Sequence, residues 1–254
     1  LFRSQGGYLA SLVICNVGTS SLVRESDLCL LTQAGPEIGV ASTKAFTTQL
    51  VGLMLLTLSL GQVHGTLDKA LEAQLVDELR RLPTRLGEAL AMDKTVEKIS
   101  ELFAEKHHSL FLGRGAQYPV AMEGALKLKE ISYIHAEAYP AGELKHGPIA
   151  LIDQDLPVFV VVPGPDTPHD LHKKVVSNIQ EIRARGARTL VIAEEGNDDV
   201  LPFADEVIRV PEAPPLLEAL LTVIPLQVFA LHLATAKGLD VDQPRNLAKS
   251  VTVE

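Results

Sequence analysis

The sequence predicts an α/β protein of the doubly wound type, in which helices cover both faces of mainly parallel sheets. Short apolar runs alternate with longer segments of helical periodicity along the chain. The run 157–162 is almost wholly apolar, which is typical of a strand buried on both faces of a parallel sheet. Gly186 and Gly238 follow helical segments, where glycine commonly ends a helix. We therefore expect ligands at the carboxyl ends of the strands.

The first series of elements is short. We expect two strands, a mostly apolar helix and two polar helical stretches, in the order 11–17, 28–32, 43–60, 67–92 and 94–105. Pro83 is expected to start a new helix within the fourth of these segments. Two strands are too few for a stable parallel sheet, so part of this domain is expected to lie upstream of Leu1.

A second series follows a domain boundary that we expect near residue 95. Its elements are strands at 110–112, 157–162, 189–193 and 206–210, and helices at 120–132, 169–185 and 216–237. The expected divisions are a first domain with connecting helices over 1–94, a second domain over 95–239, and a tail over 240–254. The tail has little periodicity, so on its own it favours disorder over a lid-like segment.

Composition excludes several classes of partner. The net charge of −9, with 4% aromatic residues and no Trp, argues against nucleic acid. Cys15 and Cys29 lie in apolar stretches without a CxxC pattern, as expected for reduced core thiols of a cytoplasmic protein. The apolar run 50–60 is too short to span a bilayer, and 216–236 contains polar residues and is interpreted as a buried helix, so no membrane association is expected. The chain starts without Met or a signal-peptide pattern, so we expect it to begin inside a longer one.

Two loops could bind an anion, although each has a simpler explanation. Gly113-Arg114-Gly115 follows a strand and precedes a helix, so its backbone could approach a phosphate. A tight turn without a ligand is equally compatible with it. Ser42 precedes the helix expected at 43–60, and spacing alone favours an N-cap role for it.

The densest group of polar residues lies at 123–146. Glu123, Lys127 and Glu130 have helical spacing and share one face. On an exposed helix they would form a solvated ladder of ion pairs, which stays an open alternative. Further acidic and basic side chains follow at His135, Glu137, Glu143, Lys145 and His146. A carboxylate near a histidine suits proton transfer at neutral pH, whereas no HExxH or other common spacing indicates a metal.

One lysine, Lys249, lies in the tail. A lone lysine in such a segment is usually solvated. If it is enclosed beside other cations or apolar groups, its amine can lose its proton and form a Schiff base with a carbonyl substrate.

Four long motifs resemble the glucosamine-6-phosphate synthase family: EIGVASTKAFTTQ at 37–49, EGALKLKEISYIHAEAY at 123–139, GELKHGP at 142–148 and DQPRNLAKSVTVE at 242–254. They extend over essentially the whole chain and are more specific than any glycine-rich turn. The resemblance implies two sugar-isomerase (SIS) α/β domains, the first incomplete, and neither cofactor nor metal. It implies the conversion of fructose 6-phosphate and glutamine to glucosamine 6-phosphate, the first committed step of UDP-N-acetylglucosamine biosynthesis. The ammonia would come from the protein's own glutaminase domain, which is absent here.

The resemblance also implies roles for particular residues. Lys249 would form the Schiff base, Glu130 would move a proton between C1 and C2 of the sugar, and Lys127 would assist proton transfer. His146 would assist ring opening in the neighbouring subunit, so we expect a homodimer. The residues that would line the sugar site are Val40, Ser42 and Ala248. These roles change the expectation for the tail from disorder to closure of the active site.

Two features of the family are missing from this sequence. They are the main phosphate-binding loop, a Ser-Gln-Ser-Gly-Glu-Thr-type segment, and the amino-terminal cysteine of the glutaminase. We therefore expect this chain alone to have little synthase activity with glutamine. Two alternatives remain: an SIS-domain deglycase or sugar-phosphate isomerase that does not use glutamine, and a non-catalytic sugar-phosphate sensor. The tail at 247–254 favours the synthase, and the presence of both Glu130 and Lys249 argues against a sensor.

Overall fold

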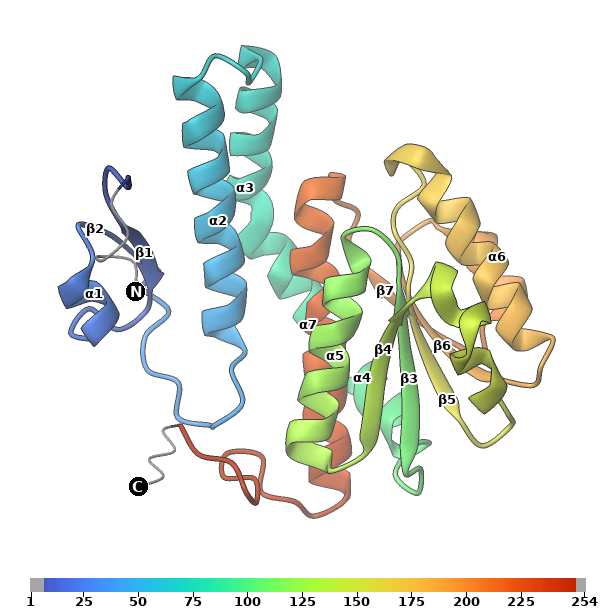
Figure 1. Cartoon of the computed structure of the whole chain (residues 1–254). Coiled ribbons are helices and arrows are strands. Elements are labelled where there is room, and N and C mark those ends of the chain that lie inside the picture. Colours follow the sequence, from blue (N-terminus) through green and yellow to red (C-terminus); the bar gives the residue numbers. More distant parts are fainter. Residues whose placement is uncertain (1–6, 250–254) are drawn as a thin grey trace. The chain divides into compact units, whose positions relative to one another are not determined.

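The computed structural model describes residues 7–249 of the chain (Figure 1). The chain divides into two compact units, Leu1–Leu75 and Val76–Glu254. This division lies within helix α3 (Lys69–Leu90), earlier than the boundary expected near residue 95. The reason is that α4 (Asp93–Glu101) packs against α7 (Pro215–Ala236), and Asp93 Oδ1 lies 2.7 Å from His232 Nε2 of that helix.

The first unit contains a small parallel sheet and one long helix. Strands β1 (Leu12–Cys15) and β2 (Leu28–Leu31) pair in parallel, close to the two strands that the sequence predicts. Helix α2 (Lys44–Val63) packs against β1, and Gly52 permits the close approach because a Cβ there would lie 3.1 Å from Ile14 Cγ2. A short helix, α1 (Ser21–Glu25), was not predicted.

Three expectations about this part of the chain are wrong. Pro83 does not start a helix, because it lies inside α3. Leu82 and Ala89, seven residues apart on this helix, are both buried. The burial of this apolar face offsets the backbone hydrogen bond that proline cannot make. The cysteines are not core residues: Cys15 is only half-buried and Cys29 is exposed, because β2 pairs only with β1 among the described residues. Both thiols are free, as expected. Thr43, not Ser42, is the N-cap of α2.

The second unit is built on a five-stranded parallel sheet with the order β4-β3-β5-β6-β7. The strands are β3 (His108–Gly113), β4 (His135–Pro140), β5 (Pro157–Val161), β6 (Arg188–Glu194) and β7 (Glu206–Val210). Four of them match predicted strands. Strand β4 was missed because it lies at the sheet edge and contains alternating polar residues. The sheet order, with β3 between β4 and β5, confirms the doubly wound fold class.

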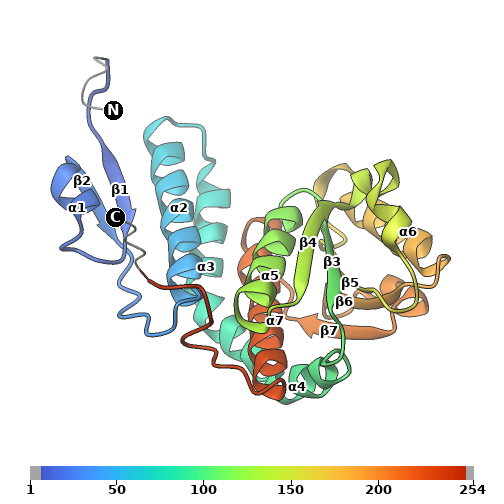
Figure 2. The same cartoon turned by 60° about the horizontal axis from the view of Figure 1, so that its bottom comes forward.

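Helices cover both faces of this sheet, as Figures 1 and 2 show. Helices α5 (Gln117–Ser132) and α7 lie on one face, over a cluster of phenylalanine rings in which Phe111 and Phe159 stack at 4.3 Å between centroids. Helix α6 (Leu171–Arg183) lies on the other face, over an aliphatic core that includes Val160 and Ile179. The 3-10 helix η2 (Ala141–His146) packs on this second face, against α6.

Two helices, α2 and α7, are long and apolar enough to cross a membrane by length and composition alone. Within α7, 67% of the apolar window is buried inside the unit, so α7 is the core helix that the sequence predicts. In α2 only 6% of the window is buried, and this helix extends beyond the apolar run 50–60 that was judged too short to span a bilayer. Such helices are weak evidence for a membrane protein, because core helices of soluble domains have the same length and composition.

Candidate active site

The row of charged residues predicted on one helix face is present on α5. Lys127 Nζ lies 2.6 Å from Glu130 Oε2 and 3.4 Å from Glu123 Oε1, so one ammonium group bridges two carboxylates. Lys127 is 3% exposed and Glu123 is 8% exposed. The row is therefore buried over most of its length, and the alternative of a solvated ion-pair ladder is wrong.

The electrostatics of the row distinguish its two acids. Burial raises the pKa of Glu123, and the nearby Lys127 ammonium partly opposes this effect. Glu123 Oε1 is buried and lies 3.4 Å from Lys127 Nζ, so the Lys127 ammonium is its charge partner. The side chain of Glu130 is 22% exposed, more than that of either neighbour. Glu130 is thus the most exposed carboxylate of the row, and the Lys127 ammonium holds its position.

The structure does not bring His146 to this row. His146 ends η2, which packs on the α6 face of the sheet, whereas α5 covers the opposite face. Its imidazole is exposed and lies 3.8 Å from Glu143. In the single chain His146 is therefore separated from Glu130 by the sheet itself.

Lys249 and Ala248 are both exposed and lie at the end of the described part of the tail. The preceding residues are ordered by specific contacts, in contrast to the disorder that the sequence alone favours. Asp240 accepts hydrogen bonds from the backbone N–H groups of residues 242 and 243, and Pro244 is buried. The backbone N–H of Arg245 donates to the Tyr133 hydroxyl at 2.8 Å, which ties the tail to the C-terminal end of α5.

The two sugar-site residues predicted in the first unit lie just before α2. Val40 and Ser42 are half-buried, and the Ser42 hydroxyl donates to Glu37 Oε1 at 3.4 Å. The same oxygen accepts the backbone N–H groups of Thr43 and Ala45, each at 3.0 Å. Glu37 therefore caps the N-terminus of α2, a role that the sequence analysis missed.

The Gly113-Arg114-Gly115 turn needs its first glycine for packing. A Cβ on Gly113 would lie 2.1 Å from the backbone oxygen of Gln117, so the strand and the following helix approach too closely for any other residue. Arg114 lies beside Gly142, where a Cβ would be 3.2 Å from the guanidinium carbon. Close packing accounts for this turn without a phosphate.

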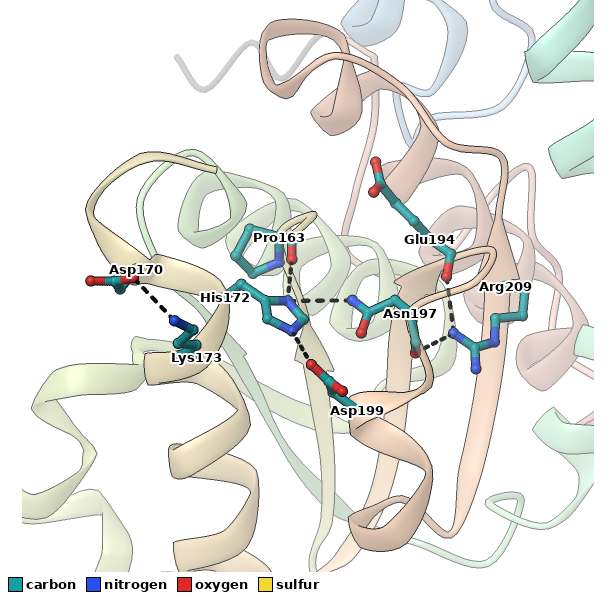
Figure 3. A network of polar contacts seen from close by, with 8 residues as sticks. All are labelled: Pro163, Asp170, His172, Lys173, Glu194, Asn197, Asp199 and Arg209. Atoms are coloured by element: carbon teal, nitrogen blue, oxygen red, sulfur yellow. Dashed lines mark hydrogen bonds and ion pairs between the residues drawn. The ribbon is translucent and has the colours of Figure 1, made fainter. Parts of the chain in front are cut away.

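The carboxyl edge of the second sheet contains a network that sequence reasoning missed (Figure 3). His172 lies 2.9 Å from the backbone oxygen of Pro163, 3.4 Å from Asn197 and 3.3 Å from Asp199. Beside this network, Gly164 N–H donates to Glu218 Oε1, and a Cβ on Gly164 would lie 2.5 Å from Glu194 Oε2.

Two carboxyl groups at this edge are kept from ionising at their usual pH. Burial raises the pKa of Glu194, and burial together with the charge of Glu194 raises the pKa of Glu218 to about 7. Both side chains are almost completely buried. The position of Glu194 at the end of a predicted strand could have identified it, but no local pattern indicates Glu218, which lies in the first turn of α7.

Two other members of the sequence-predicted group, His135 and Glu137, lie in a different region. His135, Glu137 and His108 line a cavity of about 600 Å³ at the amino ends of β3 and β4. His135 Nε2 lies 3.3 Å from Glu137 Oε1, and the Tyr139 hydroxyl hydrogen-bonds Glu137, which lowers the pKa of that carboxyl group. Among residues 7–249, no group of three or more potential ligands could hold a metal ion.

A doubly wound fold with a buried acid–lysine–acid row on the helix after its first strand fits a sugar-isomerase domain, and family comparison agrees. The pattern of the SIS domain family matches residues 2–59 and 102–237, so the chain belongs to the SIS domain family. The two matched segments leave out residues 60–101, and the boundary expected near residue 95 lies in this gap.

Individual relatives confirm the narrower resemblance that the motifs indicate. Over 248 residues the chain is 69% identical to the glutamine–fructose-6-phosphate aminotransferase (isomerizing) of Pseudomonas putida, covering 98% of this chain. It spans 40% of the length of that curated relative.

Solved structures agree with this resemblance. The C-terminal domain of glucosamine-fructose-6-phosphate aminotransferase from Francisella tularensis is 46% identical with a TM-score of 0.90, and the match covers 95% of this chain and 67% of that one. A glucosamine-6-phosphate deaminase from Thermotoga maritima is 26% identical with a TM-score of 0.65, and the match covers 95% of this chain and 66% of that one.

Proposed function

We propose that this chain is the sugar-phosphate isomerase part of a cytoplasmic glutamine–fructose-6-phosphate aminotransferase. It would convert fructose 6-phosphate and ammonia into glucosamine 6-phosphate and water, with the ammonia supplied by a glutaminase domain. The observation that carries the proposal is the Lys127–Glu130 pair on α5, at 2.6 Å, on a helix whose C-terminal end also binds the tail that contains Lys249. A base, a proton donor and an amine nucleophile are the groups that this reaction needs.

The proposed chemistry proceeds in three steps on the open-chain sugar. The Lys249 amine adds to the C2 carbonyl and water leaves, which forms a Schiff base. Ammonia then replaces the lysine at C2, so that the nitrogen stays with the sugar and Lys249 is released. The Glu130 carboxylate removes a proton from C1 and returns it to C2. The C1 hydroxyl proton passes to the C2 nitrogen, so the C2 imine becomes an amine and C1 becomes an aldehyde.

The other named residues would support these steps. Lys127 orients the Glu130 carboxylate and donates a proton to sugar oxygens as charge develops there. Val40, Ser42 and Ala248 would line the sugar. The exposed position of His146, across the sheet from α5, supports a role in ring opening at the site of a neighbouring subunit in a homodimer.

Borohydride trapping tests the proposal directly. Incubation of the full-length protein with fructose 6-phosphate and borohydride should attach the sugar to the peptide that contains Lys249. The Lys249→Arg variant should lose this labelling, because a guanidinium cannot act as the nucleophile. Labelling that maps to Lys127 or Lys129 instead would contradict the assignment.

A second function is favoured by the likeness to the Thermotoga maritima glucosamine-6-phosphate deaminase. In that case the chain would release ammonia from an amino sugar phosphate and would not use glutamine. Transfer of ¹⁵N from amide-labelled glutamine into glucosamine 6-phosphate by the full-length protein separates the two functions. Transfer supports the synthase, and its absence, together with ammonia release from glucosamine 6-phosphate, supports the deaminase.

A further inference from the structure

Tyr133 holds an unfavourable backbone conformation at the end of α5. It is the C-cap of the helix, with φ 61° and ψ 14°, in the left-handed region. Glycine or asparagine usually occupies this position, because a larger side chain meets a steric cost there. When a residue other than glycine keeps such a strained conformation, its side chain often makes contacts that the protein needs.

The side chain of Tyr133 makes two contacts with a single residue of the tail. Its hydroxyl accepts the backbone N–H of Arg245 at 2.8 Å, and the Arg245 guanidinium lies over its ring at 4.2 Å from the centroid. The second contact is a cation–π interaction, and the two contacts join residues 112 positions apart in the chain. We call this pair of contacts the Tyr133 clasp.

The segment between α7 and the clasp is shaped to bring Arg245 to this place. Gly238 ends α7 with a positive φ, Asp240 fixes the following turn, and Pro244 is buried next to Arg245. Asn246 has a φ of 65°, which turns the chain directly after the clasp. The tail up to Asn246 is therefore held by local hydrogen bonds, burial and the clasp together.

The clasp shortens the tether on which Lys249 moves. Lys249 lies eleven residues after Gly238 but only four after Arg245. At about 3.5 Å per extended residue, the maximum reach falls from roughly 38 Å to roughly 14 Å. The local concentration of a tethered group varies with about the −3/2 power of tether length, so the clasp, acting together with the Asp240 turn and the buried Pro244, raises that of Lys249 by up to roughly 5-fold.

The clasp is also close to the acid–lysine–acid row along the same helix. Glu130 precedes Tyr133 by three residues, or about 4.5 Å of helix rise. We propose that Tyr133 is a positioning residue whose clasp on Arg245 presents Lys249 to the end of α5 that carries Lys127 and Glu130. The inference deepens the proposed function and depends on the Schiff-base role of Lys249.

Hydrogen exchange of the ligand-free, full-length protein tests the clasp independently of activity. In Tyr133→Phe the ring and its cation–π contact remain, but the acceptor of the Arg245 N–H is lost. Exchange at the Arg245 amide should accelerate about 2- to 10-fold, which corresponds to the net free energy that one hydrogen bond contributes. The amides of Gly238 and Leu239, which bond to α7, are internal references and should not change. An unchanged Arg245 amide would overturn the clasp.

Trapping kinetics test the positioning role. At saturating fructose 6-phosphate, the rate of borohydride labelling at Lys249 and kcat should both fall about 2- to 10-fold in Tyr133→Phe, with a smaller change in KM. Arg245→Ala, which removes the cation, should act in the same direction. Tyr118→Phe is the matched control, because Tyr118 lies at the opposite end of α5, and it should behave as the parent protein does.

The outcomes separate this inference from the function on which it depends. If the parent protein gives no labelling at Lys249, the proposed function fails whatever the variants do. If the parent is labelled and Tyr133→Phe is labelled equally fast, the positioning role fails while the proposed function stands. Tyr133→Gly relieves the backbone strain, so a slow Tyr133→Gly protein with undiminished thermal stability excludes misfolding as the cause.

Discussion

Replacing Glu218 with glutamine should change how the stability of the second unit depends on pH. Glu218 is 2% exposed, and its Oε1 accepts Gly164 N–H. Burial first, and the charge of Glu194 second, raise its pKa to about 7 from a usual value of 4.5. Between these two pH values the folded chain binds more protons at Glu218 than the unfolded chain does. Stability is therefore lost as the pH rises through this window.

The size of the effect follows from the shift of the pKa. A change from 4.5 to about 7 corresponds to about 3 kcal/mol, at 1.36 kcal/mol per pH unit. Glutamine retains an oxygen that can accept the Gly164 N–H, but it has no charge to bury. Glu218→Gln should thus be close to the parent in stability near pH 4.5 and more stable above pH 7, by up to about 3 kcal/mol.

Calorimetric unfolding of the full-length protein between about pH 5 and about pH 8 measures this difference. The Tm of the transition that includes the second unit should fall with rising pH in the parent and should fall less in Glu218→Gln. Glu195→Gln removes a charge from an exposed residue beside Glu194 and is the matched control. Parallel Tm curves for the parent and Glu218→Gln would refute the reasoning, because they would show that Glu218 does not change its protonation on folding.

Three further outcomes follow from the site and the fold. Lys127→Met should destabilise the protein by about 3 kcal/mol near pH 7, because a buried carboxylate loses its cation, and calorimetry at lower pH should show partial recovery as Glu123 takes up a proton. Gly113→Ala should lower stability by about 2 kcal/mol or more, since its Cβ would lie 2.1 Å from a backbone oxygen; an unchanged thermal midpoint would show that the turn can shift freely. When His146→Ala and Lys249→Ala chains are co-expressed and pair at random, about half of the dimers are hybrids, and each hybrid has one intact site of two. The mixture should therefore regain about a quarter of parental activity. If no activity returns, His146 acts in the same site as the Lys249 of its own chain.

Much of the fold follows from local sequence patterns. Apolar runs identified the central strands β3, β5 and β6, which are buried on both faces of the sheet, and a shorter run with alternating polar residues identified the edge strand β7. The helices after them were also predicted, since their apolar residues recur at helical spacing. Strand β4 escaped prediction because its short sequence alternates polar residues with alanine and contains no apolar run.

Less of the site could be predicted, because its residues meet only through long-range contacts. The helical spacing of Glu123, Lys127 and Glu130 indicated a shared face, but only the fold shows that this face is buried. Nothing in the sequence indicates that Tyr133 binds Arg245, because the pairing depends on how the end of α7 lies relative to the end of α5. Glu218 and Glu194 likewise meet only because a helix and a strand converge at Gly164.

The burial of Glu194 and Glu218 explains why the candidate chemistry is not at the carboxyl edge of the second sheet. A doubly wound fold ordinarily binds ligands at that edge, beside the strand where the order reverses. Here the carboxyl groups of Glu194 and Glu218 occupy the space beside Gly164. At a pH above their raised pKa values both groups are negatively charged and would repel a phosphate.

The charged row instead lies in the second half of α5. A helix that follows a parallel strand runs back toward the amino ends of the sheet, so the part of α5 that carries Lys127 and Glu130 lies nearer to the opposite edge from Glu194. The tail returns to that same end through Tyr133. The second domain therefore serves the proposed reaction through the far end of one helix, and a site formed there must be completed by groups from outside its own sheet. This requirement accounts for the tail lysine and for the histidine expected from a neighbouring subunit.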